Sequence, residues 1–246
     1  MGYTRLRYTR SSYFGYISRG VKWLLISNVV VFLLCYFGGP AVTRHATVLL
    51  GLSAEAAVHN LMIWQVFTYM FLHGGFTHLL FNMLALWMFG STLEQDWGTR
   101  RFLKYYFYCG IAAGVCVVVA NIAVGEWGIP TIGASGAIFG LLVAFGVLYP
   151  NQTVLMNFLF PIKAKYMVMI YAAIELLLTF GPNTGVSTMA HLGGMAFGYL
   201  YLKGRWPRVG LADARSAYNQ WRLQRAKRKF QVYMRKHGKG GGPWVN

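Results

Sequence analysis

Four polar residues that could perform chemistry stand in apolar stretches of this sequence. Ser135 lies in TIGASGAIFG, His78 and Asn82 in HGGFTHLLFN, and His191 in MAHLGGMAFG. His78 and Asn82 are four residues apart, so they share one face of a helix. A serine, a histidine and donors for a developing negative charge are the parts of nucleophilic acyl transfer. We expect Ser135 to be the nucleophile and His191 the general base and acid. The Ser135 backbone amide, His78 and Asn82 would then form the oxyanion hole.

The amino-acid composition indicates that these residues lie in a membrane environment. Of the 246 residues, 56% are hydrophobic and 12% are charged, and several apolar runs approach the roughly 20 residues that cross a bilayer. We therefore predict an all-α membrane protein with six transmembrane helices, the fourth of them short and starting inside the membrane. The predicted spans are about 21–37, 76–93, 102–124, 135–149, 166–180 and 189–202.

Distances along these helices place the four polar residues at similar depths. At about 1.5 Å per residue, Ser135 lies about 21 Å from the inner face, His191 and Asn82 about 18 Å, and His78 about 24 Å. All four therefore fall in the outer half of a core of about 30 Å. The short fourth span also leaves the preceding GEWGIPTIG in the membrane, where its backbone needs protein or water as a partner. We expect a water-filled cavity above Ser135, facing the positive end of the helix.

Basic residues predict the orientation in the membrane. Of the 23 Lys and Arg, 12 fall from Lys203 onward, and most of the others lie before the first span or in two of the loops. By the positive-inside tendency, both termini are cytoplasmic and the site opens on the opposite side. We predict a basic cytoplasmic segment 1–20, a membrane domain 21–203 and a basic, partly helical cytoplasmic tail 204–246. The tail contains WRLQRAKRKF, which beside a membrane favours anionic lipid headgroups over nucleic acid as the partner.

No acidic residue is evidently linked to His191 in the sequence. The six acids are Glu55, Glu94, Asp96, Glu126, Glu175 and Asp213. Three of them belong to the predicted cytoplasmic side, and the other three have no evident connection to the histidine. We therefore predict a Ser135–His191 dyad, and we expect Glu175 to hydrogen-bond a neighbouring helix or to be protonated. No metal or cofactor is predicted, because no set of His or Cys residues has ligand spacing.

The motifs resemble those of the rhomboid family of intramembrane serine proteases. Four pieces match in the family's order within about 64–199: HGGFTHLLFN with His73, His78 and Asn82; Glu94 to Gly98 as E-x3-G; GASG with Gly133, Ser135 and Gly136; and AHLGGMAFG with His191, Gly194 and Gly198. The resemblance implies a six-helix rhomboid core with Ser135 and His191 as the catalytic pair. It also implies an oxyanion hole at His78 and Asn82, and peptide bonds in or near single transmembrane helices as the substrate.

The resemblance implies roles for the segments around the site as well. Gly194 and Gly198 would let the sixth helix approach the fourth closely, as small residues do in membranes. The segment 38–75 would be a long first loop lying partly in the membrane interface. The segment 181–188, rich in Gly, Pro, Asn and Thr, would be a mobile cap over the site.

Two residues depart from the family pattern. Gln65 follows Trp64 where many relatives have arginine, and Phe139 stands where many bacterial members have tyrosine. Phe139 can still stack against the ring of His191, although it offers no hydroxyl group. Neither departure touches the Ser135–His191 pair.

Two other classes of function remain open. A catalytically inactive rhomboid-like protein would bind membrane proteins, for example in quality control, but such proteins usually lack the serine or the histidine. A channel or transporter would need a continuous polar path, whereas the inner halves of the spans, such as IFGLLVAFGVL, are apolar. We expect an integral multi-pass protein of a bacterial plasma membrane whose substrate is a single-span membrane protein.

Overall fold

The computed structural model describes residues 17–156, 160–179 and 188–204. The chain divides into two units, Met1–Lys203 and Gly204–Asn246, and every described helix and strand lies in the first. The predicted N-terminal segment is outside the described residues except for its end. The predicted cap is outside them except for Thr188, and the predicted tail except for Gly204.

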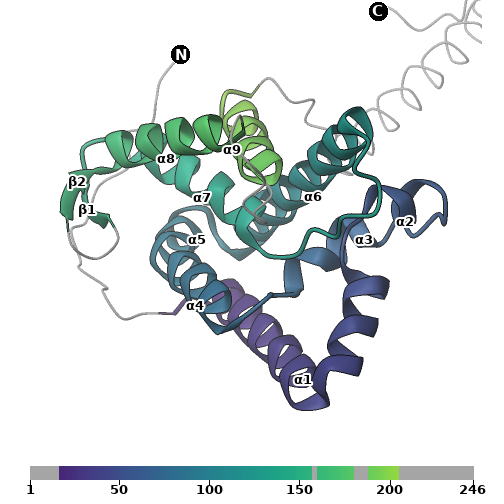
Figure 1. Cartoon of the computed structure of the whole chain (residues 1–246). Helices are drawn as coiled ribbons and strands as arrows, with labels where there is room; N and C mark the ends of the chain where they lie inside the picture. The colour runs from purple at the N-terminus through teal and green to yellow at the C-terminus, as the bar shows by residue number, and fades with distance from the viewer. Residues whose placement is uncertain (1–16, 157–159, 180–187, 205–246) are drawn as a thin grey trace, which may run out of the picture. The chain divides into compact units, whose positions relative to one another are not determined.

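The described chain is mostly helical (Figure 1). Its elements in order are α1 (Arg19–Leu50), α2 (Ala54–Val58), α3 (Gln65–Thr68), the 3-10 turn η1 (Tyr69–Phe71), α4 (Phe76–Ala85), the π-helical turn η2 (Leu86–Gly90), α5 (Ser91–Trp97), α6 (Thr99–Val124), α7 (Ser135–Leu148), β1 (Thr153–Met156), β2 (Phe160–Lys163), α8 (Ala164–Thr179) and α9 (Thr188–Leu202). Each predicted apolar run overlaps helices of this set, with its ends shifted by a few residues except at the end of α1. The predicted end at residue 180 lies outside the described residues. The all-α prediction is wrong at one place, because β1 and β2 form a short antiparallel hairpin between α7 and α8.

Three helical stretches in the described residues are long and apolar enough to cross a membrane. They are Arg19–Leu50, Phe76–Trp97 and Thr99–Val124. The helix α7 is apolar but shorter, and its 14 residues extend about 21 Å. Ten of these 14 residues are buried, so α7 is surrounded mainly by protein.

The first helix is longer than the predicted span because it continues beyond a kink. Gly39 has φ +78° and ψ −177°, and Pro40 follows it. Only glycine adopts this left-handed φ readily, and proline cannot donate a backbone hydrogen bond, so the helix is interrupted there. The first straight part of α1 therefore ends close to residue 37, where the predicted span ends, and a second helical segment, 40–50, follows the kink.

The carboxylate of Glu94 in α5 ties together the starts of α1 and α6. It accepts hydrogen bonds from the backbone N–H groups of Gly20 at 2.7 Å and Val21 at 2.8 Å. The hydroxyl groups of Ser18 and Thr99 also donate to it. The first N–H groups of a helix have no acceptor within the helix and favour a nearby negative charge. Glu94 therefore supplies the missing cap for α1 from a distant part of the chain.

We expect Glu94→Gln to lower the free energy of unfolding by about 2–4 kcal/mol, because hydrogen bonds to a charged group are lost and one amide hydrogen faces other donors. Thermal unfolding in detergent, followed by circular dichroism, measures the change. Glu55→Gln makes the same chemical change at an exposed residue and should shift the midpoint little. Equal midpoints for Glu94→Gln and the wild type would contradict this assignment.

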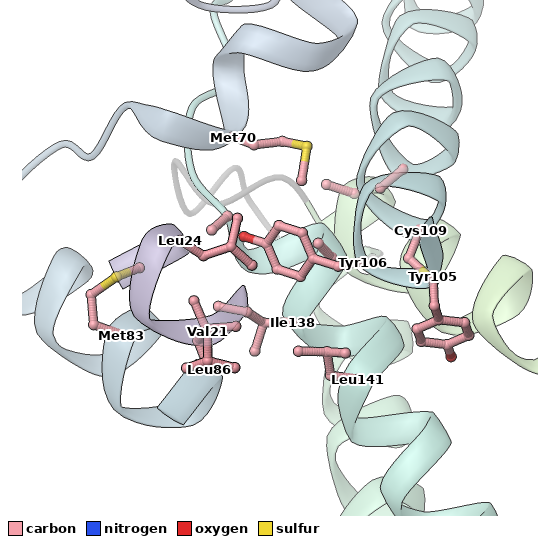
Figure 2. Close-up of a cluster of buried hydrophobic side chains, with 14 of the residues drawn as sticks. Val21, Leu24, Met70, Met83, Leu86, Tyr105, Tyr106, Cys109, Ile138 and Leu141 are labelled. Carbon is pink, nitrogen blue, oxygen red and sulfur yellow. The ribbon is translucent and has the colours of Figure 1, made fainter. Parts of the chain in front are cut away.

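The core lies where α1, α4, α6 and α7 meet. Figure 2 shows Tyr106 of α6 among Leu24 of α1 and Ile138 and Leu141 of α7, all of them buried. On the other side of α7, the helix α9 packs against both α6 and α7. Small residues in the helices make this contact possible, because they let the backbones approach closely.

Glycines decide how closely α9 approaches α7. A Cβ atom added to Gly194 would lie 1.9 Å from the carbonyl oxygen of Gly136, and one added to Gly198 would lie 3.1 Å from Cα of Gly140. The space is therefore already filled by the backbone of α7. This is the close approach that the resemblance implied for Gly194 and Gly198.

The helix α8 lies beside α7 and α9, next to the β1–β2 hairpin (Figure 1). Half of its 16 residues are exposed, and these exposed side chains are apolar or aromatic. Its buried side chains are Ala164, Met167 and Glu175. The Glu175 carboxylate is therefore covered by neighbouring elements, unlike the exposed leucines that follow it on α8.

Candidate active site

Ser135 is the first residue of α7, and the backbone before it is held by protein. Thr131 exchanges backbone hydrogen bonds with Leu52 at 2.7 and 2.9 Å, and the N–H of Gly133 donates to the carbonyl of Tyr69 at 2.9 Å. These bonds satisfy part of the segment that the sequence placed inside the membrane. Within the described part of the chain, no side chain caps the start of α7, so the amide of Ser135 is among the N–H groups that can bind an anion.

His191 of α9 lies directly beside Ser135. Its Nε2 atom is 2.8 Å from Oγ of Ser135, within the reach required of a general base. The imidazole is buried, with 6% of the residue exposed. The structure thus brings together two residues that are 56 positions apart in the chain.

Phe139 covers one face of the His191 ring. The ring centroids are 4.2 Å apart and the planes differ by 16°, so the expectation that these rings stack is confirmed. Phe139 lies one helical turn after Ser135, which places it on the same side of α7. The stack keeps the plane of the imidazole in one orientation.

His78 lies against Gly133, close to Ser135. A Cβ atom added to Gly133 would be 2.8 Å from both Cε1 and Nε2 of His78 and 3.8 Å from Oγ of Ser135. Gly133 also has φ +125°, which side-chain-bearing residues rarely adopt. Both the backbone conformation and the nearby imidazole therefore require glycine at this position.

Asn82 and His73 both contact His78. Nδ2 of Asn82 donates to the carbonyl of His78 at 2.8 Å, which leaves the second amide hydrogen available to a ligand. His73, in the connection before α4, packs edge to face against His78 at 5.0 Å. Burial, aided by the neighbouring His78, lowers the pKa of His73 to about 4. His73 is therefore neutral near pH 7.

A cavity of about 1260 Å³ joins these side chains. Ser135, His191, His78, Asn82 and Phe139 all line it, which agrees with the cavity expected above the serine. In the described ranges, no three His, Cys, Asp or Glu side chains converge on a possible metal position. The catalytic and oxyanion roles assigned to the lining residues remain predictions.

Glu175 corrects the sequence-based account of the acids. Its Oε1 atom is 2.9 Å from Nδ1 of His191, and both side chains are buried. The sequence showed no evident link between an acid and His191, and the structure supplies one. The expectation that Glu175 contacts a neighbouring helix agrees with this position, since His191 belongs to α9. The sequence did contain a signal, because an ionisable residue inside a membrane normally has a partner. The partner could not be chosen, since the rotation of α8 relative to α9 is set by packing.

The fold and the site define a helical membrane protein with a serine–histidine pair that lines a cavity. The rhomboid domain profile matches residues 60–208, and the chain belongs to the rhomboid family. Its relatives include rhomboid proteases, which agrees with the hydrolase chemistry that the paired side chains suggest.

Three relatives illustrate the similarity. YdcA, a rhomboid of Bacillus subtilis (strain 168), is 36% identical over 137 residues, which are 56% of this chain and 64% of YdcA. RHOMBOID-like protein 1 of Arabidopsis thaliana is 32% identical over 185 residues, or 74% of this chain and 45% of the relative. Rhomboid protease GluP of Bacillus subtilis (strain 168) is 31% identical over 173 residues, which are 70% of this chain and 32% of GluP. The chain thus spans less than two thirds of the length of each of these relatives.

Proposed function

We propose that this protein is an intramembrane serine endopeptidase that cleaves single-span membrane proteins in or near their transmembrane segment. The observation that carries the proposal is the 2.8 Å separation between Oγ of Ser135 and Nε2 of His191, at a cavity within a membrane domain. Membership of the rhomboid family supports it. We further propose that α1, the stretch α4–α5, α6, α7, α8 and α9 form six membrane helices.

In the proposed reaction the same groups act in both the acylation and the deacylation of Ser135. Oγ of Ser135 attacks the peptide carbonyl as its proton passes to Nε2 of His191. The negative charge on the carbonyl oxygen is stabilised by the Ser135 amide, by the free hydrogen of Asn82 and by His78. The imidazolium then returns the proton to the leaving amine, and water releases the acyl group from Ser135 by the same route.

We propose that both termini are cytoplasmic and that the cavity opens on the opposite side of the membrane. The distribution of Lys and Arg supports this orientation. We place the protein in a bacterial plasma membrane, in keeping with its similarity to two Bacillus subtilis proteins. Anionic lipid headgroups are the proposed partner of the basic residues from Lys203 onward.

Labelling with a serine-reactive fluorophosphonate probe tests the proposal without knowledge of the substrate. We expect the purified wild type to be labelled and Ser135→Ala and His191→Ala to remain unlabelled. A rhomboid protease of known activity, labelled in parallel, shows that the detergent permits the reaction. No labelling of folded wild-type protein would overturn the enzyme assignment and favour an inactive rhomboid-like binder.

Asn82→Ala should lower the rate of cleavage about 10²- to 10³-fold, because one donor to the oxyanion is removed. Unfolding should change little, since the lost contact is a hydrogen bond within α4. Cleavage of a single-span protein in liposomes measures the rate, and thermal unfolding measures the fold. A normal rate in Asn82→Ala would exclude Asn82 from the oxyanion hole.

A further inference from the structure

Glu175 is a buried carboxylate that the reaction described above does not use. After Lys165 it is the only acidic or basic residue of α8, and its neighbours Leu176 and Leu177 are exposed. Placing a carboxylate among apolar helices is costly unless an opposite charge or a donor accompanies it. The side chain that accompanies Glu175 is His191.

The three side chains form a chain of contacts through the imidazole. Oε1 of Glu175 is 2.9 Å from Nδ1 of His191, and Nε2 of the same ring is 2.8 Å from Oγ of Ser135. The Nδ1–H bond does not point straight at the carboxylate oxygen, so the contact has the distance of an ion pair without hydrogen-bond alignment. Such contacts in free enzymes often become aligned only when the substrate binds.

Phe139 alone cannot determine which nitrogen of His191 faces the serine. A half-turn about the Cβ–Cγ bond leaves the ring in the same plane, so the stack with Phe139 tolerates it. The half-turn would replace Nε2 by a carbon atom beside Ser135. A carboxylate at Nδ1 disfavours this rotation, because it accepts the N–H of one ring orientation and not the C–H of the other.

We propose that Glu175 is a positioning residue that holds His191 in the tautomer and ring orientation needed to deprotonate Ser135. The inference rests on the proposed protease function. Nδ1 keeps its proton beside the carboxylate, so the lone pair of Nε2 faces the serine hydroxyl. When the serine proton moves to Nε2, the imidazolium is paired with the Glu175 carboxylate. Glu175 gains and loses no proton, and the proton on Nε2 leaves with the amine.

Fluorophosphonate labelling kinetics on the full chain separate this role from a structural one. The maximal labelling rate, kinact, reports the activation of Ser135, and the half-saturating probe concentration, KI, reports probe binding. We expect Glu175→Gln to lower kinact at least about 30-fold, since an amide can select the wrong tautomer, with KI within about twofold. Glu175→Asp keeps the charge, so its kinact should be at least about tenfold higher than that of Glu175→Gln. Glu55→Gln removes an exposed carboxylate and should label like the wild type.

Each other result has a defined meaning. An unlabelled wild type would contradict the proposed function itself, before Glu175 is considered. A labelled wild type with equal kinact in Glu175→Gln would overturn the positioning role and leave the protease assignment intact. A loss that Glu175→Asp does not relieve would also overturn it, because shape rather than charge would then be responsible. If Glu175→Gln does not fold, Glu175→Ala takes its place: it also removes the carboxylate and should lower kinact at least about 30-fold at constant KI, and a wild-type kinact in Glu175→Ala contradicts the proposal.

Discussion

Ser135→Ala and His191→Ala should each reduce cleavage of a single-span substrate in liposomes at least about 10⁴-fold, because residues of one catalytic unit depend on one another. For the same reason, the double variant should cleave no more slowly than either single variant. The serine without its base is a weak nucleophile, and the base without the serine has no proton to accept. The separation of 2.8 Å between the two groups is the structural basis of this expectation.

Substitutions of a serine and a histidine outside the site serve as controls, because they remove the same side chains without changing the proposed catalytic pair. Ser27 donates to the carbonyl of Leu24 within α1, and His45 is exposed and contacts only the carbonyl of Ala41 among the interactions described. Ser27→Ala and His45→Ala should retain near-normal rates. Cleavage by Ser135→Ala at the wild-type rate would refute the assignment of the nucleophile. Effects that multiply in the double variant would show that the two residues act independently.

Gly194→Ala should both destabilise the protein and reduce cleavage at least about 100-fold. The added Cβ would lie 1.9 Å from the carbonyl oxygen of Gly136, and no rotamer change can relieve a collision between Cβ and backbone. The helices α7 and α9 must therefore move apart, at a cost of at least about 2 kcal/mol. Ser135 is on one of these helices and His191 on the other, and a displacement of about 1 Å can cost about 10²-fold in rate.

A graded series makes this prediction testable even where one variant folds poorly. At Gly198 the added Cβ would lie 2.5 Å from the hydroxyl oxygen of Tyr105, the end of a side chain, and 3.1 Å from Cα of Gly140. Gly198→Ala should therefore lose less stability and less activity than Gly194→Ala. At Gly128 the nearest atom would be 3.5 Å away, so Gly128→Ala serves as the control. Thermal unfolding and liposome cleavage should both show the largest loss for Gly194→Ala, a smaller loss for Gly198→Ala and little change for Gly128→Ala. A wild-type unfolding midpoint and cleavage rate in Gly194→Ala would contradict the packing described.

Much of the site could be predicted from residues that are close in the chain. His78 and Asn82 are one helical turn apart, and Ser135 and Phe139 likewise, so helical geometry alone places each pair on one face. The long apolar runs predicted the helices because only a helix satisfies its own backbone in a membrane. The β1–β2 hairpin was missed, since short extended segments between helices carry no comparable signal.

Contacts between distant segments could not be derived in the same way. Glu94 caps α1 across more than seventy residues, and its motif offered no indication of that partner. Glu175 was assigned no link to His191, although its carboxylate lies 2.9 Å from Nδ1. In both cases the identity of the partner depends on how one helix is rotated and shifted against another.

The sequence by itself determined the helical membrane fold class, the family motifs and the residues that line the candidate site. Hydrophobic length and helical periodicity are local properties, so they can be obtained from the chain alone. Only the tertiary structure decided that Ser135 meets His191 at hydrogen-bond distance and that Glu175 lies behind the imidazole. These distances depend on the close approach of α7 and α9 at Gly136 and Gly194, which is a property of packing between helices rather than of either helix.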